Sequence, residues 1–281
     1  FKFAGACLGH RKGGVAMAAV GACAGFGAIC GSSLATAATM GKVALPELRR
    51  LGYSGALSTG ALAAGGTLGI LIPPSVILII YSILTEQNIA KMFLCAFIPG
   101  LLAALGYIVA ISLYVRLNQN SGPIKDRVPW KDRMYFFKNI WHIILIFVVM
   151  IGGIYMGFFT PTEGAAIGAA GTGIIAITNK SFNIKSFIEV IESTAVTTGM
   201  IFFVLLGAEF FNSFIALTQL PNVLTEFSKE NNLEPLIVVA CIMILYLFLG
   251  CLMDSLAMIL LTIPVFFPLV MSLDFGLSPE E

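Results

Sequence analysis

Charged residues are scarce in this chain. Lys, Arg, Asp and Glu make up 11% of its 281 residues, whereas about 25% is typical of a soluble domain. Only two histidines are present, His10 and His142, and no nucleophile, base and orienting group recur at a usable spacing. The net charge of +1 gives no reason to expect a nucleic-acid partner. We therefore expect neither an enzyme nor a nucleic-acid-binding protein.

The six cysteines form no metal-binding pattern. They lie in apolar runs, without a Cys-x-x-Cys pair and without histidine or acidic neighbours at metal spacing. We interpret them as small packing residues and expect no cofactor.

Hydrophobic residues, by contrast, make up 58% of the chain. Since a spanning helix needs roughly 20 apolar residues, the chain can hold about eight to ten membrane segments. We predict one all-α polytopic membrane domain. Because the chain starts without Met and stops abruptly at Pro279-Glu280-Glu281, we also expect it to be a fragment of a longer subunit.

An apolar stretch at about 56–84 contains the elements of a broken helix. The adjacent Pro73 and Pro74 remove two backbone donors, and Gly69 lowers helix stability just before them. In hydrocarbon the freed carbonyls need partners, so such a break is tolerated only where it is buried in protein or lines a polar cavity. A helix broken at mid-membrane indicates an ion or substrate site of a transporter.

The stretch at about 13–45 predicts a re-entrant hairpin. It is flanked by His10-Arg11-Lys12 on one side and by Lys42, Arg49 and Arg50 on the other. The positive-inside tendency assigns both basic flanks to the cytoplasm, so the chain would enter and leave on one side, with a tip near residues 31–33. The alternative is one ordinary crossing with basic residues at both ends.

The remaining elements follow from the same alternation of apolar runs and charges. The stretch at 117–139 has a strong basic excess, which predicts a cytoplasmic loop between a first repeat part at 1–116 and a second at 140–281. We predict helices at 89–113, 140–159 and 164–177, an amphipathic interfacial helix at 181–192, a second hairpin at about 194–226 and a second broken helix at about 236–273.

An internal repeat relates the two parts. A shift of the chain by about 181 positions places Pro73-Pro74 opposite Asp254-Ser255, and Ser32 opposite Ser213. This predicts two similar halves, each with one hairpin and one broken helix that meet near mid-membrane. An inverted repeat needs an odd number of crossings between the hairpins, whereas four are clear. Either residues 186–206 supply a fifth, or one of the four does not cross.

Few polar residues lie inside the apolar stretches. All of them offer oxygen atoms as ligands, and none is Lys or Arg. Hydroxyls, amide oxygens, a carboxylate and freed carbonyls are hard ligands that suit sodium better than a soft metal. The alternative is that Ser and Thr bond to their own backbone or hold helices together. Asp254 is costly in an apolar run, by about 2.5 to 3.5 kcal/mol, so we expect it to have a cation, a proton or a helix N-terminus as its partner.

Five segments form a recognisable set: residues 26–41, 46–53 and 69–75, the motif Thr160-Pro161-Thr162-Glu163, and Met253-Asp254 followed by Pro264. Together they resemble the large membrane subunit of tripartite ATP-independent periplasmic (TRAP) transporters. One departure is Ser255, because the family often has proline after Met-Asp. The departure puts the geometry after Asp254 in doubt.

The resemblance implies an inverted-repeat, elevator-type fold with two re-entrant helical hairpins and two broken helices. It implies sodium-coupled import of an organic acid, such as a sialic acid or a C4-dicarboxylate, across a bacterial inner membrane. Its partners would be a small membrane subunit, a periplasmic substrate-binding protein and the lipid bilayer. The competing hypothesis is an uncoupled channel or a membrane scaffold subunit.

The resemblance and the polar residues together define a set of candidate site residues. The candidates for sodium or substrate binding are Gly31, Ser32, Ser33, Thr36, Gly69, Pro73, Pro74, Ser75, Asn212, Ser213, Asp254 and Ser255. Within this set, the expected sodium ligands are Ser32, Ser33, Gly69, Ser213 and Asp254.

Overall fold

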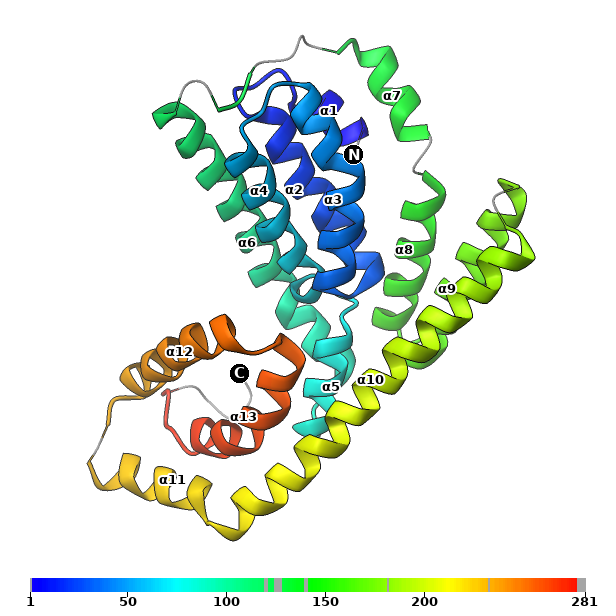
Figure 1. Ribbon diagram of the computed structural model, residues 1–281. Coiled ribbons are helices and arrows are strands. Elements are labelled where there is room, and N and C mark those ends of the chain that lie inside the picture. Colours follow the sequence, from blue (N-terminus) through cyan, green and yellow to red (C-terminus); the bar gives the residue numbers. More distant parts are fainter. Residues whose placement is uncertain are drawn as a thin grey trace. The chain divides into compact units, whose positions relative to one another are not determined.

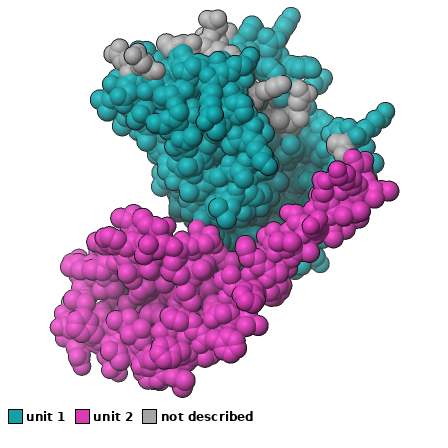
Figure 2. All heavy atoms as spheres, in the orientation of Figure 1, with its two compact units in different colours: residues 1–82, 87–181 teal, residues 83–86, 182–281 magenta. Residues whose placement is uncertain are grey.

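The computed structural model describes residues 2–118, 121–123, 128–138, 141–180, 182–231 and 233–276. Over these residues the chain forms thirteen helices and no strand (Figure 1). They group into two compact units, one of residues 1–82 and 87–181 and the other of residues 83–86 and 182–281 (Figure 2). The all-α prediction is confirmed for the described part of the chain.

The first unit contains most of the buried residues. Its helices are α1 Lys2–Leu8, α2 Gly14–Cys30, α3 Ser33–Arg50, α4 Gly55–Leu71, α5 Val76–Leu84, α6 Ile89–Leu117, α7 Trp130–Lys138, α8 Trp141–Tyr155 and α9 Pro161–Thr178, the end of α5 belonging to the second unit. Helix α2 contacts α3, α4 and α6, and these four helices run side by side (Figure 1). Helix α2, which the sequence predicts to be one arm of the first hairpin, is therefore at the centre of this unit.

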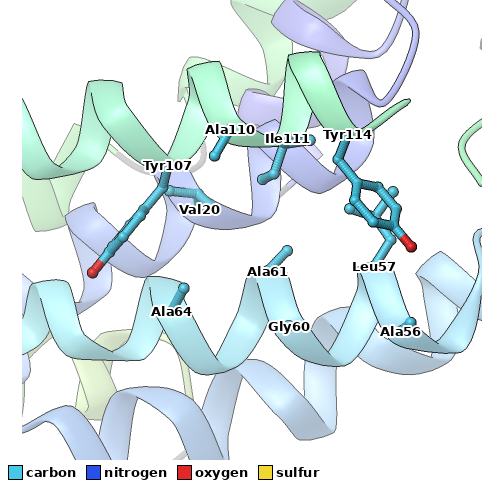
Figure 3. A pocket seen from close by; sticks show the side chains of 10 residues that line it. All are labelled: Val20, Ala56, Leu57, Gly60, Ala61, Ala64, Tyr107, Ala110, Ile111 and Tyr114. Carbon is cyan, nitrogen blue, oxygen red and sulfur yellow. The ribbon is translucent and has the colours of Figure 1, made fainter. Parts of the chain in front are cut away.

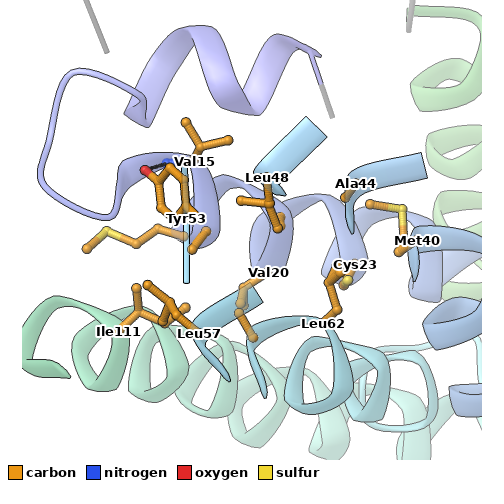
Figure 4. Close-up of a cluster of buried hydrophobic side chains, with 14 of the residues drawn as sticks. Val15, Val20, Cys23, Met40, Ala44, Leu48, Tyr53, Leu57, Leu62 and Ile111 are labelled. Carbon is orange, nitrogen blue, oxygen red and sulfur yellow. Dashed lines mark hydrogen bonds between the residues drawn. The ribbon is translucent and has the colours of Figure 1, made fainter. Parts of the chain in front are cut away.

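The core of the first unit is built from small and medium side chains. Val20, Cys23 and Leu48 are fully buried in it (Figure 4). Leu68 is fully buried in the same core. At one end of the core, the Tyr53 hydroxyl accepts a hydrogen bond from the Val15 N–H (3.2 Å) and donates one to the Pro123 carbonyl (3.1 Å). This side chain joins the starts of α2 and α4 to the segment that follows α6.

The turn between α2 and α3 lies where the sequence predicts the first hairpin tip. Gly31 has φ +64°, a left-handed conformation that glycine adopts at no steric cost, and its N–H donates to the Gly27 carbonyl (2.7 Å). Ser32 is extended, and its Oγ accepts from the Ala35 N–H (3.4 Å) as the N-cap of α3. A glycine stop followed at once by a serine cap reverses the chain within two residues.

The predicted broken helix is confirmed. Helices α4 and α5 are separated by Ile72–Ser75 and bend by 43° at this break. Pro73 and Pro74 lack the N–H groups that would continue the ladder to the carbonyls four residues earlier, so the helix ends at Leu71.

The predicted loop at 117–139 contains a helix. Helix α7 begins at Trp130, directly after Pro129, because proline is tolerated just before or inside the first turn of a helix. Helix α6 ends at Leu117, before this helix begins. Residues 119–120, 124–127 and 139 lie outside the described residues.

The second unit contains α10 Ile184–Leu217, α11 Leu220–Glu230, α12 Pro235–Leu252 and α13 Ser255–Met271. Helix α13 contacts each of the other three. The predicted second broken helix is present, with its break at Met253 and Asp254.

The expected interfacial helix at 181–192 and hairpin at 194–226 differ from the structure. Residues 184–217 form one continuous helix, and the chain turns only at Thr218 and Gln219. The physical reason is that no proline occurs until Pro221, so every residue keeps its N–H donor. Two isolated glycines in α10 lower helix stability by only about 1 kcal/mol each.

Three of the described helices, α6, α10 and α12, are long and apolar enough to cross a membrane. Counting the bent pairs α4–α5 and α7–α8 as one span each raises this number to five. Large side chains on the candidate spans are exposed, such as Leu102 (62%), Phe203 (80%) and Leu247 (71%). Helix α10 is a candidate span in the region where an inverted repeat needs a further crossing.

The contact between α2 and α4 depends on two glycines. A Cβ added to Gly27 would lie 2.5 Å from the Gly69 Cα, a distance that real Cβ atoms do not tolerate. We predict that Gly27→Ala lowers the apparent melting temperature of the purified full-length protein, because overpacking of this kind costs about 1 to 3 kcal/mol.

Gly21→Ala is the matched control, since Gly21 lies on the same helix and a Cβ there would have nothing within 4 Å. That change should leave the melting temperature unchanged or raise it, because alanine favours the helix. Equal effects of the two substitutions would show that the α2–α4 contact does not set stability.

Candidate functional site

The α2–α3 turn packs directly on the end of α4 and on the α4–α5 break. A Cβ added to Gly69 would lie 2.7 Å from the Thr36 Oγ1 and 2.8 Å from the Ser32 carbonyl oxygen. A Cβ added to Gly31 would lie 3.2 Å from the Pro74 carbonyl oxygen. The structure therefore brings together the candidate residues of the first unit, from a segment at 31–36 and a segment at 69–75.

Two hydroxyls in this contact are buried without a hydrogen-bond partner. Thr36 is fully buried and Ser75 is 1% exposed, and among the described residues neither Thr36 Oγ1 nor Ser75 Oγ has a hydrogen-bond partner. A buried hydroxyl without a partner costs about 1 to 3 kcal/mol. In helices Ser and Thr often bond to the carbonyl four residues earlier, as Ser82 does with Leu78. Thr36 in α3 does not use this alternative, and Ser75 lies outside a helix, in the break before α5.

Backbone carbonyls are also available at the contact. In an uninterrupted helix, the carbonyls of Gly69 and Ile70 would accept from residues 73 and 74, and both of these are prolines without an N–H. The Ser32 carbonyl already accepts from the Thr36 N–H (3.1 Å), although a carbonyl oxygen can accept twice. Hydroxyl and carbonyl oxygens thus lie together at the contact between the tip and the break, where the two prolines have no N–H groups to donate.

A cavity of about 470 Å³ adjoins the tip and the break. Gly31, Pro74 and Ser75 form one part of its lining, and Met150 and Thr172 from α8 and α9 contribute to the opposite part. No Lys, Arg, Asp or Glu is among its lining residues. An anion held here would depend on hydroxyls, backbone amides or a bound cation.

The α8–α9 part of the cavity is missing from the sequence-based set. Added Cβ atoms at Gly164, Gly168 and Gly171 would lie 2.8 to 3.1 Å from side-chain atoms of α8. The spacing of these glycines, four and then three residues, places them on one face of α9. This spacing is the signal that could have predicted the close α8–α9 pair.

Helix α9 begins as the sequence indicates. The Thr160 N–H (2.8 Å) and the Thr160 hydroxyl (2.9 Å) donate to the Glu163 carboxylate, and the Glu163 N–H donates back to the Thr160 hydroxyl. These hydrogen bonds lower the pKa of the Glu163 carboxyl. The bond from the Thr160 N–H has the larger effect, and the bond from the Thr160 hydroxyl has the smaller one. Glu163 is therefore ionised at neutral pH and serves as a helix cap.

A second cavity, of about 310 Å³, lies between α4 and α6 (Figure 3). Small residues of α4, such as Gly60 and Ala64, form its floor, and Tyr107 and Tyr114 of α6 lie at its two ends. The Tyr107 hydroxyl already bonds to Thr67 (3.0 Å). With only tyrosine hydroxyls as polar groups, this cavity has little to offer an ion or an acid.

Asp254 has one of its expected partners, a helix N-terminus. Its Oδ2 accepts from the Leu256 N–H (3.1 Å) as the N-cap of α13, and the side chain is exposed. Ser255 takes the first position of α13, which proline also favours. The departure from the family pattern therefore leaves the helix start intact.

Asn212 satisfies a carbonyl that a proline frees. Pro264 cannot donate to the Leu260 carbonyl, and the Asn212 Nδ2 donates to it instead (3.4 Å). The Asn212 Oδ1 is buried without a partner. Ser213 is exposed in the continuous helix α10 and does not form a hairpin tip. Leu260 lies six residues after Asp254, about 9 Å along α13.

Acidic and soft metal ligands do not cluster. Across the described ranges, no group of three or more His, Cys, Asp or Glu residues could hold a metal ion. The oxygens of the described residues at the tip are neutral hydroxyls and carbonyls.

Comparisons with known proteins match the chain over almost its whole length. The family model of the tripartite ATP-independent periplasmic transporter, DctM component, matches residues 1–278. The C4-dicarboxylate TRAP transporter large permease protein DctM of Pseudomonas aeruginosa is 35% identical over 278 residues, which cover 99% of this chain and 64% of that protein. The Sialic acid TRAP transporter permease protein SiaT of Haemophilus influenzae is 33% identical over 280 residues, covering 99% and 45%. The chain thus spans less than two thirds of the length of these relatives.

The chain belongs to the family of TRAP transporter large permease subunits. The resemblance noted in the sequence is thereby confirmed over almost the whole chain. Its relatives are transporter permeases rather than enzymes. The family and the apolar helices together make it a multi-pass membrane protein.

The role of Asn212 gives a prediction for a double-mutant cycle. We expect Asn212→Leu to destabilise the full-length protein by about 1 kcal/mol or more, because the Leu260 carbonyl loses its donor. In the Pro264→Ala background the same change should cost less, since the alanine that replaces the proline has an N–H and donates to that carbonyl itself.

The Asn212 Oδ1 is removed in both backgrounds, so its contribution cancels in the cycle. Thermal unfolding of the four proteins in one detergent measures the coupling. A cost of Asn212→Leu that is the same in the wild-type and the Pro264→Ala backgrounds would contradict the role of the amide as a replacement donor.

Proposed function

We propose that this chain is the membrane-embedded part of a sodium-coupled secondary transporter that imports a small organic acid. The observation that carries the proposal is the packing of the α2–α3 tip on the α4–α5 break, with two buried, unpartnered hydroxyls, Thr36 and Ser75, at the contact. Membership of the family and the adjacent cavity support it.

Sodium would be held by neutral oxygens at the tip. The sodium ligands would be the Thr36 and Ser75 hydroxyls and the carbonyls of Ser32 and Gly69. All four are hard oxygen ligands without net charge. A bound cation would remove the cost of the two unpartnered hydroxyls. This set modifies the sequence-based one, because the Ser32 hydroxyl caps α3.

The acid would bind beside the cation. Helices α3 and α5 both begin at the tip–break contact, and a helix N-terminus offers free N–H groups and the positive end of the helix dipole to an anion. Two relatives are named for C4-dicarboxylate and sialic acid. We propose a substrate of this class, with its carboxylate on backbone amides, hydroxyls or the bound sodium.

The remaining parts of the proposal follow from the family. We propose elevator-type alternating access in a bacterial inner membrane, with a small membrane subunit and a periplasmic binding protein as partners. One relative, from Oleidesulfovibrio alaskensis, is named as an isethionate TRAP transporter permease protein DctMQ. The rival function is an uncoupled channel or scaffold, in which the break serves packing alone.

The test is uptake into proteoliposomes that contain the full-length subunit, its small subunit and its binding protein. Labelled C4-dicarboxylate and labelled sialic acid are supplied with and without a sodium gradient. We expect saturable, sodium-dependent uptake of one of them. Uptake that is unchanged when choline replaces sodium would exclude coupling and favour the channel.

The same assay tests the tip. Thr36→Val removes one hydroxyl with little change of shape, so the sodium concentration for half-maximal uptake should rise about tenfold, as expected for the loss of one ligand worth roughly 1.4 kcal/mol. Ser75→Ala should act in the same direction.

Thr39→Val is the matched control, because Thr39 is an exposed residue on the same helix. It should leave the sodium dependence unchanged. If Thr36→Val and Thr39→Val give the same sodium curve, the Thr36 hydroxyl is not a sodium ligand.

A further inference from the structure

Three cationic side chains border one hollow of the first unit. Arg11 and Lys12 lie in the turn between α1 and α2, and Arg116 lies in the last turn of α6. The hollow has a volume of about 510 Å³, and the rest of its lining comes from Met17, Ile108, Val109 and Ser112. It is separate from the tip and break, because the two cavities share no lining residue.

The convergence of the three charges is built into the fold. Gly13 has φ +72°, and a Cβ added there would lie 2.9 Å from the Val115 Cγ2. Val115 is fully buried. The close approach of Gly13 to Val115 places the residues just before Gly13 next to the residue just after Val115. Arg11, Lys12 and Arg116 are neighbours for this reason.

These charges have no carboxylate to neutralise them within the described ranges. All three side chains are exposed, and the ion pair formed by the described residues is between Arg50 and Glu47 instead. Three like charges around one hollow repel one another, and the repulsion is relieved when an anion enters. The hollow is therefore suited to a group with more than one negative or acceptor oxygen, such as a phosphate.

The apolar part of the lining indicates where that phosphate comes from. Helix α6 is a candidate membrane span, and its side chains beside the hollow are exposed, Val109 by 55% and Leu113 by 53%. Arg116 lies in the last turn of this span, at the level where basic side chains meet lipid head groups. A soluble anion would use the charges alone, whereas a lipid uses the charges and the apolar face together.

We propose that this hollow binds the phosphate head group of an anionic phospholipid, with its acyl chains along α6. The basic flanks place this end of the unit on the cytoplasmic side, so the lipid belongs to the inner leaflet. The inference does not depend on the transported substrate or on sodium coupling. It assigns a lipid-binding role to basic residues that topology rules treat only as orientation signals.

Native mass spectrometry tests the proposal on the full-length protein released from nanodiscs of phosphatidylcholine and phosphatidylglycerol. Wild type should retain phosphatidylglycerol in preference to phosphatidylcholine. The triple variant Arg11→Gln/Lys12→Gln/Arg116→Gln should lose this preference by about tenfold or more, because each basic residue near the surface contributes on the order of a fivefold factor.

Two control variants distinguish this site from general surface charge. Lys42→Gln/Arg49→Gln/Arg50→Gln removes three charges from α3 and should keep the preference. Arg11→Lys/Lys12→Arg/Arg116→Lys keeps the charge and should also keep it. Equal retention by wild type and the Arg11/Lys12/Arg116 glutamine variant, or equal losses in both glutamine variants, would overturn the proposal.

A further arm separates lipid from soluble phosphate. Inorganic phosphate and glycerol phosphate are added at millimolar concentration before release. Retention of phosphatidylglycerol should persist, because the acyl chains contribute to binding. Full displacement by either soluble anion would overturn the lipid assignment and make the hollow a site for soluble phosphate.

Discussion

The absence of two backbone N–H groups at Pro73 and Pro74 is the constraint on which the first unit depends. In an apolar surrounding the carbonyls that lose these donors cannot turn to water, so protein groups must come close to them. The α2–α3 tip packs on the break, and it can approach only because Gly27, Gly31 and Gly69 have no side chain. The break, the tip and the glycine contacts are therefore one arrangement, and the candidate ion site is a consequence of it.

The prolines of α13 meet the same constraint with the opposite result. Pro264 frees the Leu260 carbonyl, yet α13 continues, and Asn212 on α10 supplies a replacement donor. Pro46 in α3 and Pro99 in α6 also lie inside continuous helices. A proline inside an apolar helix therefore does not by itself predict a break. In α4 two consecutive donors are missing, and one side chain could not replace both.

The sequence predicted the local geometry of the tip and the break in the first unit, but not the continuous helix α10 in the second. Gly31 and Ser32 carry a stop and a cap in adjacent positions, so the turn is encoded locally, as is the break at Pro73-Pro74. Residues 212 and 213 were placed at a tip by analogy with the first half, but nothing in their neighbourhood stops a helix. Thr36 and Ser75 were among the expected residues, whereas the absence of partners for their hydroxyls is visible only in the packing.

The sequence by itself determined the helical class, the two helix breaks and the family, because these depend on composition and on backbone donors that are present or absent locally. The tertiary structure alone decided which oxygens lack partners, which carbonyl Asn212 serves and which basic residues share a hollow. Arg11 and Arg116 are about a hundred residues apart and become neighbours through the contact of Gly13 with Val115. Such proximity depends on how helices pack. Packing depends on the fit between side chains that are far apart in the sequence, so no local sequence pattern encodes it.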